Sequence, residues 1–457
     1  MHAEAARLLA AAEQLARAGE RGRALQALSR ALDLAPEDAA APYAALIAGV
    51  SPSGWHPKLD SDLRTCLASP AVDPQMLARV TARVLLLHYP EPAVAEDPLW
   101  IAFLTRCINV DPAMEARLVW LAGQKLPEAL RAALAAQAFA SEYAWGGEGL
   151  GVPPEAAAEI AEERRLVEAL PSLSPVRKGE RGVSDAVRAQ YEANPYPRWR
   201  APPAPEQRSV GELLAALGAP QLGPLEVLVA GCGTGFEPID LARTDPSLRV
   251  TALDLSAASL AHGQRVARAL GVAVRFIQGD ILDVAALGRD FAMVSSTGVL
   301  HHMADPAAGL TALAGVTRPG GVLRIALYSE RARAWVREAH RAIAEHGFAA
   351  TPEGIRAFRR HVLALPAGDP LARLAESDDF YTLSGCRDLA FHAHEHWYRL
   401  PEIGAILAVA GLELLRIETP PGAPFPADPL DLAGWDAIEA RHPHLFAGMI
   451  HLWIRRP

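Results

Sequence analysis

The sequence has few of the features that mark several classes of protein. Only four of its 457 residues are cysteine, and Cys66, Cys107, Cys232 and Cys386 lie too far apart for the C-x-x-C pairs of zinc or redox centres. Reduced thiols are therefore expected. The sequence also has no uninterrupted apolar run of about 18 residues, the length that a membrane-spanning helix needs.

The sequence also lacks an excess of positive charge. The formal net charge is −9 at pH 7, so no global basic field would draw the chain to nucleic acid or to an anionic membrane. The N-terminus has Glu4 and a helical Ala/Leu/Arg pattern where a secretory signal needs a basic start and an apolar block. We therefore expect a cytoplasmic protein, and expect neither a membrane nor nucleic acid as its partner.

Length and composition predict a folded, multidomain protein. At about 150 residues per domain, the chain allows two or three domains. A content of 51% hydrophobic and 21% charged residues is globular. We expect a helical domain over 1–168, a linker with a Pro- and aromatic-rich lid segment over 169–205, and an α/β domain over 206–457.

Ala- and Leu-rich stretches with apolar residues three and four apart, broken by Pro and Gly, predict the helical domain. Its first part resembles one tetratricopeptide repeat, in which small residues let two helices pack closely and a proline ends the second. The positions at that spacing are Leu8, Ala12, Leu15, Gly19, Ala24, Leu28, Ala31 and Pro36. No second clean copy follows, so we expect a degenerate helical stack. Two roles stay open for it: a structural or homodimerising domain, and a surface that recognises a protein or peptide.

From Leu225 onward, short apolar runs alternate with helical segments, which is the pattern of β-α-β units and a mainly parallel sheet. A long interruption over about 331–398 carries its own helices and is expected to form a lid. The seven expected strands span 225–230, 248–254, 272–277, 291–296, 321–328, 412–418 and 449–456.

Glycines and acidic residues follow the first three strands. VLVAGCGTG places Gly231, Gly233 and Gly235 just before a helix, where glycine lets the backbone approach a ligand or simply turn tightly. Asp254 ends the second strand, where a carboxylate can accept both ribose hydroxyls of a nucleoside or cap the next helix. Asp280, in GDI, follows the third strand at the same edge, where ligands bind in open α/β folds.

AGCGTG, the strand-ending Asp254, GDI, GVLHH and RPGG resemble the successive motifs of class I S-adenosylmethionine (SAM) dependent methyltransferases over about residues 190–330. The resemblance implies a Rossmann-like, seven-stranded, mostly parallel sheet with SAM as the cofactor. QYEANPYPRW also looks like a segment that precedes the glycine loop in methyltransferases with tetratricopeptide-like N-terminal regions. The alternative, a nicotinamide or flavin dehydrogenase, would need a third glycine where Phe236 stands.

The resemblance also implies roles for single residues. By motif, the three loop glycines would pack against the methionyl part of SAM and Asp254 would hold its ribose hydroxyls. Asp280 would bind the adenine amino group, with Ile281 against the ring.

Two groups of histidines are candidates for proton transfer or for binding the methyl acceptor. His301 and His302 follow the fourth strand, where the loop faces the transferring methyl group, and a pKa of roughly 6.5 suits a proton acceptor. They would equally cap a helix or pack beside SAM, because methyl transfer from a sulfonium rests mainly on positioning. His392, His394 and His396 alternate, so an extended backbone would place all three on one face.

We predict that these three histidines line the acceptor pocket and bind no metal, because neighbours on one strand rarely converge on one ion. Tyr191, Tyr196 and Trp199 are expected to act as a lid, and Tyr328 to complete the floor of the pocket. Arg198 is a candidate for meeting an anionic group on SAM or substrate.

The sequence thus predicts transfer of a methyl group from SAM to an O, N or C nucleophile. The helical domain favours a peptide or protein acceptor, with a small metabolite as the alternative and a nicotinamide-dependent oxidoreductase as the remaining one. The acceptor itself is not identified by any residue.

Overall fold

The computed structural model describes residues 2–173, 182–197, 199, 205, 208–220, 223–366 and 368–457. These residues divide into two compact units. The first, called the helical unit here, consists mainly of residues 1–157 and 346–389, and the second, the sheet unit, of residues 158–200, 206–345 and 390–457. Much of the expected linker, including Arg198, lies outside the described residues.

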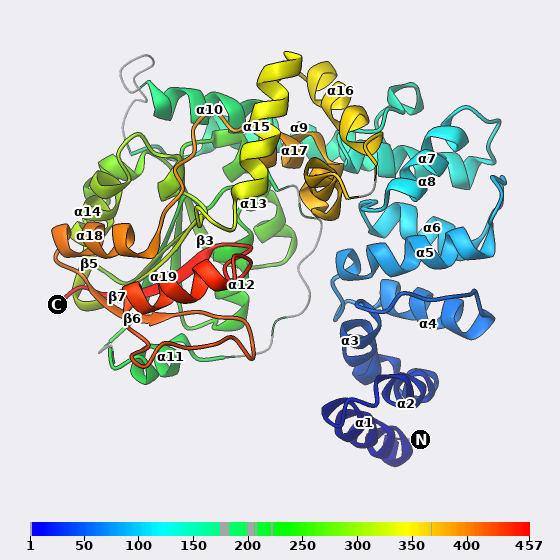
Figure 1. Ribbon diagram of the computed structural model, residues 1–457, viewed down its shortest axis with the longest axis horizontal. Coiled ribbons are helices and arrows are strands. Elements are labelled where there is room, and N and C mark those ends of the chain that lie inside the picture. The colour runs from blue at the N-terminus through cyan, green and yellow to red at the C-terminus, as the bar shows by residue number, and fades with distance from the viewer. Residues whose placement is uncertain are drawn as a thin grey trace. The chain divides into compact units, whose positions relative to one another are not determined.

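The helical unit begins with a series of short helices (Figure 1). Two of them start in the same way: Asp97 and Asp111 accept a backbone N–H of the first turn, and a proline that needs no partner for a backbone N–H follows each. These helices and turns are α1 (His2–Arg17), α2 (Arg21–Leu34), α3 (Pro36–Ile47), α4 (Pro57–Ala68), η1 (Pro74–Leu77), α5 (Ala78–His88), α6 (Pro98–Arg106), α7 (Pro112–Ala122), α8 (Glu128–Ala140) and η2 (Glu148–Leu150). The following helix α9 (Pro154–Ala169) crosses the boundary between the units, which lies near residue 157 and not at the expected 168.

The segment over 331–398, which is expected to form a lid, is divided between the two units. Its middle part, residues 346–389, packs with the N-terminal helices and holds α16 (Pro352–Leu363), η5 (Pro370–Glu376), η6 (Asp378–Tyr381) and most of α17 (Leu383–Ala390). The reason is a buried charge network. Arg359 is 1% exposed and donates to Glu115 at 2.5 Å and to the carbonyl oxygens of Ala144 and Phe380. A buried guanidinium is stable only with such a full set of partners, and the N-terminal helices supply two of the three.

The sheet unit contains the predicted α/β fold, and the seven strands expected from the sequence are confirmed in the described part of the chain. They are β1 (Glu226–Ala230), β2 (Arg249–Asp254), β3 (Val274–Gln278), β4 (Phe291–Thr297), β5 (Thr317–Leu327), β6 (Glu413–Ile417) and β7 (Ile450–Arg455). Their order in the sheet is β3-β2-β1-β4-β5-β7-β6, with β7 antiparallel to both neighbours. The first five strands are parallel, so their carboxyl ends meet at one edge.

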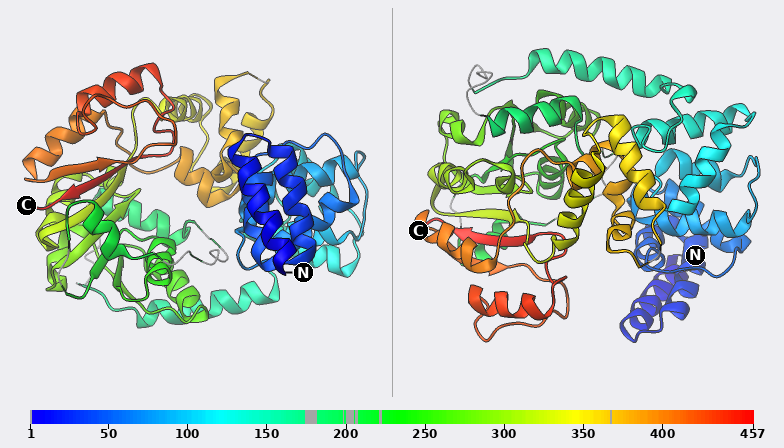
Figure 2. Two further views of the ribbon diagram at one scale, coloured as in Figure 1. Left: turned by 90° about the horizontal axis from the view of Figure 1, so that it is seen from below. Right: turned by 45° about the horizontal axis from the view of Figure 1, so that its top comes forward.

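Helices cover both faces of this sheet (Figures 1 and 2). Because side chains alternate along a strand, Leu228 and Ala230 of β1 belong to the core on one face, and Val227 and Val229 to the core on the other. The first face is packed by η3 (Ile281–Leu287), α14 (Pro306–Val316), α18 (Leu400–Val409) and α19 (Leu432–Arg441). The second face is packed by α11 (Val210–Ala216), α12 (Phe236–Thr244) and α13 (Ala257–Ala269). The remaining elements are α10 (Val183–Ala193), η4 (Leu300–His302) and α15 (Ala334–His346).

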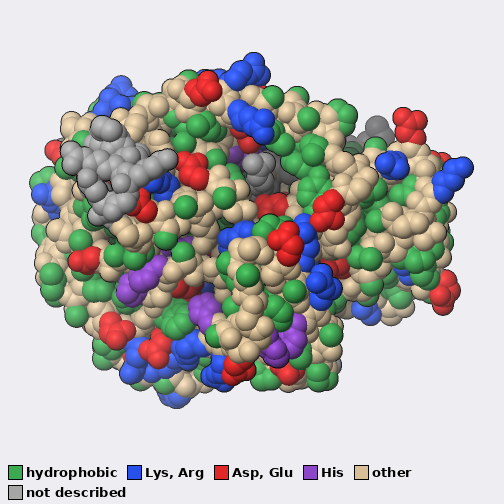
Figure 3. Space-filling view, turned by 90° about the horizontal axis from the view of Figure 1, so that it is seen from above, with side chains coloured by type: hydrophobic (Ala, Val, Ile, Leu, Met, Phe, Trp, Pro, Cys, Tyr) green, Lys and Arg blue, Asp and Glu red, His purple; other side chains and the backbone are tan. Residues whose placement is uncertain are grey.

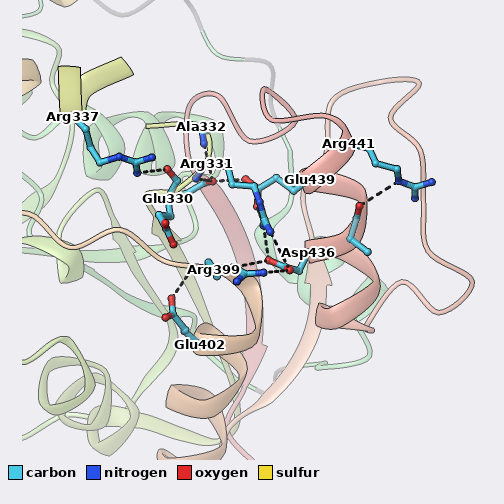
Figure 4. A network of polar contacts seen from close by, with 11 residues as sticks. Glu330, Arg331, Ala332, Arg337, Arg399, Glu402, Asp436, Glu439 and Arg441 are labelled. Atoms are coloured by element: carbon cyan, nitrogen blue, oxygen red, sulfur yellow. Dashed lines mark hydrogen bonds and ion pairs between the residues drawn. The ribbon is translucent and has the colours of Figure 1, made fainter. Parts of the chain in front are cut away.

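A polar network fixes the chain where it leaves β5 (Figure 4). Ser329 donates to Glu439, which is fully buried, and Arg331 donates to Asp436 of the same helix α19 at 2.6 Å. Arg399, just before α18, donates to the other oxygen of Asp436. Hydrogen bonds to these two arginines lower the pKa of Asp436 to about 2. The network therefore ties β5, α18 and α19 together beside the carboxyl end of the sheet.

Among the described residues, every helix is too short or too polar to cross a lipid bilayer.

Candidate functional site

The candidate site lies at the carboxyl ends of the parallel strands, as the sequence predicted. Two groups of residues lie there, and each is given a name. The cofactor end comprises the glycine loop 231–235, Asp254 and Asp280, which follow β1, β2 and β3. The histidine end comprises His301, His302 and Tyr328, which follow β4 and β5, together with the segment 392–396.

The glycine loop needs glycine at each of its three predicted positions. Gly231, Gly233 and Gly235 all have positive φ, at 72°, 52° and 84°. A Cβ on Gly231 would lie 2.4 Å from the side chain of Val299, in the loop after β4. The amides of Gly231 and Cys232 donate to the carbonyl of Leu253, so the loop is pinned to the end of β2. The loop thus presents bare backbone at the edge of the sheet.

Asp254 binds the loop from the neighbouring strand. One carboxylate oxygen accepts the N–H of Gly233 at 2.8 Å and the other accepts the N–H of Ser256 at 2.8 Å. Burial raises the pKa of Asp254 to about 6, and the nearby carboxylate of Glu192 adds to the rise. The expected cap of α13 is made by Ser256 and Glu192: Ser256 accepts the N–H of Ser259, and Glu192 accepts those of Ala257 and Ala258. Each Asp254 oxygen keeps a lone pair for a further donor.

Asp280 and Ile281 follow β3 as predicted. Asp280 is 8% exposed and accepts the N–H of Leu282, so it also caps the short helix η3. Ile281 is buried in the core of the first face. The backbone of Gly279 donates to the carbonyl of Asp254, which places the two acidic residues on adjoining strand ends. Their assignment to the adenine ring stays a prediction.

The three aromatic residues expected to form one lid do not lie together: Trp199 lies at the cofactor end and Tyr191 at the histidine end. Trp199 donates from its indole to Thr234 at 3.1 Å and packs edge-on against Phe236 and His262. The carbonyl oxygen of Tyr196 would lie 3.2 Å from a Cβ on Gly233. The indole of Trp199 and the backbone at Tyr196 and Pro197 therefore lie against the glycine loop, because Thr234 accepts from the indole and donates to the carbonyl oxygen of Pro197. A place for Trp199 in the acceptor pocket does not agree with these contacts.

Tyr191 instead reaches the histidine end. Its hydroxyl lies 3.3 Å from Nε2 of His392, and the ring of His392 stacks on that of His302 with centroids 3.6 Å apart. The fold thus brings together Tyr191 and His392, which are 201 positions apart in sequence, and His302 and His394, which are 92 positions apart. The next residue, Glu192, caps α13 beside Asp254, so adjacent side chains of α10 contact both ends of the site.

His301 is fully buried, and both of its ring nitrogens have no hydrogen-bond partner among the described residues. Its ring lies 3.9 Å from that of Tyr328 and 4.2 Å from that of His302. Burial lowers the pKa of His301 well below its usual value, and the charges of Arg333 and of neighbouring histidines add to this. His301 is therefore neutral at neutral pH, and one of its ring nitrogens offers a lone pair to a hydrogen-bond donor. An unsatisfied buried imidazole also indicates that a polar group of a ligand or a water belongs beside it.

The three histidines of FHAHEHWY do not share one face. His392 turns towards His302 because its Nδ1 is bonded within the bend, 2.7 Å from the carbonyl oxygen of His394. His394 and His396 face each other, with their Nε2 atoms 3.0 Å apart. The amide of His396 donates to the carbonyl oxygen of His301. The segment is therefore joined directly to the loop after β4.

Three residues of this site had no signal in the sequence. Glu192 has its partners about 65 positions away, and Arg333 and Glu395 are 62 positions apart. Each lies in a segment whose local pattern predicts only a solvated helix or loop. The partner of Glu395, Arg333, could be identified only from the fold.

The cofactor end fits SAM on the evidence of its own residues. A side chain at position 231 would collide with Val299, so only bare backbone fits there, and the Asp254 carboxylate lies at the loop with lone pairs to spare. By their positions, the glycines would contact the methionyl part, Asp254 the ribose and Asp280 the adenine.

Comparison with known proteins agrees with this fit. Residues 227–321 match the family described as Methyltransferase domain. An uncharacterized protein of Synechococcus is 35% identical over 257 residues, which are 51% of this chain and 60% of that protein. A malonyl-[acyl-carrier protein] O-methyltransferase of Serratia marcescens is 38% identical over 117 residues, 26% of this chain and 43% of that protein. The chain thus spans less than two thirds of the length of these curated relatives.

Among solved structures, PKMT2 of Rickettsia typhi in complex with AdoHcy is similar with a TM-score of 0.44 and 15% identity, over 56% of this chain and 55% of that one. The family match, the strand order and the glycine loop with its two acidic residues decide against the dehydrogenase alternative. Residues 227–321 thus form a methyltransferase domain, and the sheet has the fold expected for the class I SAM-dependent methyltransferases.

Proposed function

We propose that the protein transfers a methyl group from SAM to an O, N or C nucleophile, leaving S-adenosylhomocysteine. The observation that carries the proposal is that the glycine loop with Asp254 lies at the carboxyl edge of the same sheet as His301, whose ring nitrogens have no partner among the described residues. SAM, when bound, supplies a methyl group on a sulfonium, so the leaving group is already activated. The protein's part is then to bind, orient and exclude water.

The histidine end is assigned to the acceptor. His301 would take the proton of a protonated nucleophile, and His302 would support it through the stack with His392. Tyr191, Tyr328, His394 and His396 would line the acceptor pocket. Trp199 is reassigned to holding the glycine loop, because its indole donates to Thr234. The backbone of Tyr196 lies beside the same loop, and the pocket role of its side chain stays a prediction.

A peptide or protein acceptor is proposed because the chain carries a whole helical unit in addition to the methyltransferase fold. A small or carrier-linked metabolite is the alternative, and the name of the Serratia relative is of that kind. Nucleic acid is not favoured. On the face shown in Figure 3, acidic and basic side chains are interspersed, whereas a phosphate backbone is bound by continuous basic areas.

The test is to incubate the protein with methyl-labelled SAM and a native lysate, and to separate proteins from small molecules. Label in the protein fraction supports the proposal, and label only in small molecules supports the alternative. The control is Asp254→Ala, which is expected to give no label in either fraction. A parent protein that neither binds SAM in calorimetry nor transfers label refutes the proposed function.

A further inference from the structure

A buried ion pair lies directly behind the histidine end. Arg333 follows β5, and its Nε and Nη2 atoms donate to the two carboxylate oxygens of Glu395 at 3.2 and 2.9 Å. The side chains are only 7% and 3% exposed. The indole N–H of Trp397 also donates to Glu395. Both oxygens of Glu395 are therefore occupied, and its charge is compensated.

The pair holds a ring stack. The guanidinium of Arg333 lies 3.7 Å from the centre of the Tyr328 ring, and that ring lies 3.9 Å from the ring of His301. A cation at this distance from a tyrosine ring is attracted to it, and the planar guanidinium also stacks on it. Removing the carboxylate partner would free Arg333 to leave the stack.

The pair also holds the backbone of the histidine segment. On one side of it, the amide of His396 donates to the carbonyl oxygen of His301 at 2.8 Å. Two residues further, the amide of Tyr398 donates to the carbonyl oxygen of Tyr328 at 2.9 Å. Glu395 therefore lies just before two backbone hydrogen bonds, one to the loop after β4 and one to the residue after β5.

We propose that Arg333 and Glu395 are a positioning pair, which fixes the histidine segment and the Tyr328 ring against His301. This inference rests on the proposed function, because it concerns the acceptor side of the same site. Buried ion pairs often contribute little net stability compared with apolar replacements, but a bidentate pair such as this one fixes the relative orientation of its two side chains. Displacement of a reacting group by about 1 Å costs roughly a hundredfold in rate, so a fixed arrangement matters here.

The experiment compares four full-length proteins: the parent, Glu395→Gln, Arg333→Lys and the control Glu338→Gln. The control removes a carboxylate of helix α15, which begins directly after Arg333; this carboxylate pairs with Arg341 on the surface. Each protein is treated with diethyl pyrocarbonate, which acylates neutral imidazole, and the acylation rate of each histidine is followed by peptide mass spectrometry. SAM affinity is measured by calorimetry, and methyl transfer by label uptake from the lysate.

In Glu395→Gln, His301 and His396 are expected to react at least about tenfold faster, as in a locally opened segment. His262, which is buried and bonded to Glu163 in the same unit, should keep its rate. SAM affinity should stay within about twofold and methyl transfer should fall about a hundredfold. Arg333→Lys keeps the positive charge but loses the two parallel N–H donors of the guanidinium. Its acylation rates and its methyl transfer should lie between those of the parent and those of Glu395→Gln. The control should match the parent.

Unchanged rates at His301 and His396 in Glu395→Gln would overturn the inference. So would an increase that His262 shares, because that result means general destabilisation. A parent that fails to bind SAM would instead refute the proposed function and leave the acylation comparison valid.

Discussion

The cofactor end and the histidine end of the site are built in different ways. At the cofactor end, backbone atoms of the glycine loop and a carboxylate about twenty residues later form the surface, and they are joined through two neighbouring strands. At the histidine end, side chains from the loops after β4 and β5, from helix α10 and from the segment 392–396 form it. The cofactor end thus depends on small residues that are close in sequence, and the histidine end depends on side chains that only the fold brings together.

This difference teaches which variants should affect which step. Changes at the cofactor end should act on SAM affinity, and changes at the histidine end on methyl transfer at saturating SAM. The predictions below test that separation.

The largest effect is expected for His301→Gln. Loss of a positioned base lowers the rate of transfer by roughly 10²- to 10⁴-fold, whereas SAM affinity should stay unchanged. Label transfer at saturating SAM and calorimetry measure the two quantities. The exposed His444 provides the control, His444→Gln, which should match the parent. A parallel loss of SAM affinity would show that His301 belongs to the cofactor end.

Gly231→Ala should weaken SAM binding about a hundredfold, because the new Cβ meets Val299 and the backbone has positive φ. The matched control is Gly271→Ala, which also has positive φ but open space around it. It should lower the stability by about 1 kcal/mol and leave SAM affinity intact. Calorimetric affinities and urea unfolding of both variants are the measurements. Equal SAM affinities of the two variants would show that SAM binding does not need glycine at position 231.

The pH dependence of SAM binding should reflect Asp254. Because burial raises its pKa to about 6, the carboxylate takes up a proton as the pH falls through that value and then accepts hydroxyl groups poorly. SAM affinity should fall by up to about tenfold per pH unit below this point. Asp254→Asn should abolish the dependence. Glu192→Gln removes a neighbouring negative charge and should move the midpoint to lower pH.

The smallest effect is expected for Asp436→Asn, which lies outside both ends. The hydrogen bonds of Arg331 and Arg399 hold the pKa of Asp436 at about 2, below its usual value, so their stabilisation is complete above the usual value and lost as the pH falls towards 2. The variant should unfold about 1–2 kcal/mol more easily at pH 6, and the difference should shrink between about pH 4 and pH 2. Urea unfolding at several pH values measures it. A changed SAM affinity at pH 6 would show that the network does more than support the fold.

The same difference explains which parts of the fold and of the site could be predicted from the sequence. The strands, their mostly parallel arrangement and the cofactor end were predictable, because glycine spacing and strand-ending acids are short-range patterns that backbone geometry requires. His301 and His302 were found because they follow a strand. Glu192, Arg333 and Glu395 were not, because their partners are more than 60 positions away and nothing local distinguishes them from surface charges.

Trp199 shows the opposite error. Aromatic residues on a proline-stiffened segment suggested a lid over the substrate, but the indole binds Thr234 and packs against two helices of the sheet unit. Composition alone could not tell which surface the segment contacts, because Thr234, the partner of the indole, is 35 positions away in sequence.

The buried Arg359 makes the helical unit discontinuous in sequence, since Glu115 and Ala144 come from its first part and Phe380 from its second. Cutting the chain in the linker therefore does not isolate a methyltransferase: it strips a charged core residue of its counter-ion and leaves the insert without a scaffold. The two chain connections of that insert run through α15, directly after Arg333, and through residues 390–396. Both chain connections of the insert therefore border residues assigned above to the acceptor side, Arg333 at one and the segment 392–396 at the other.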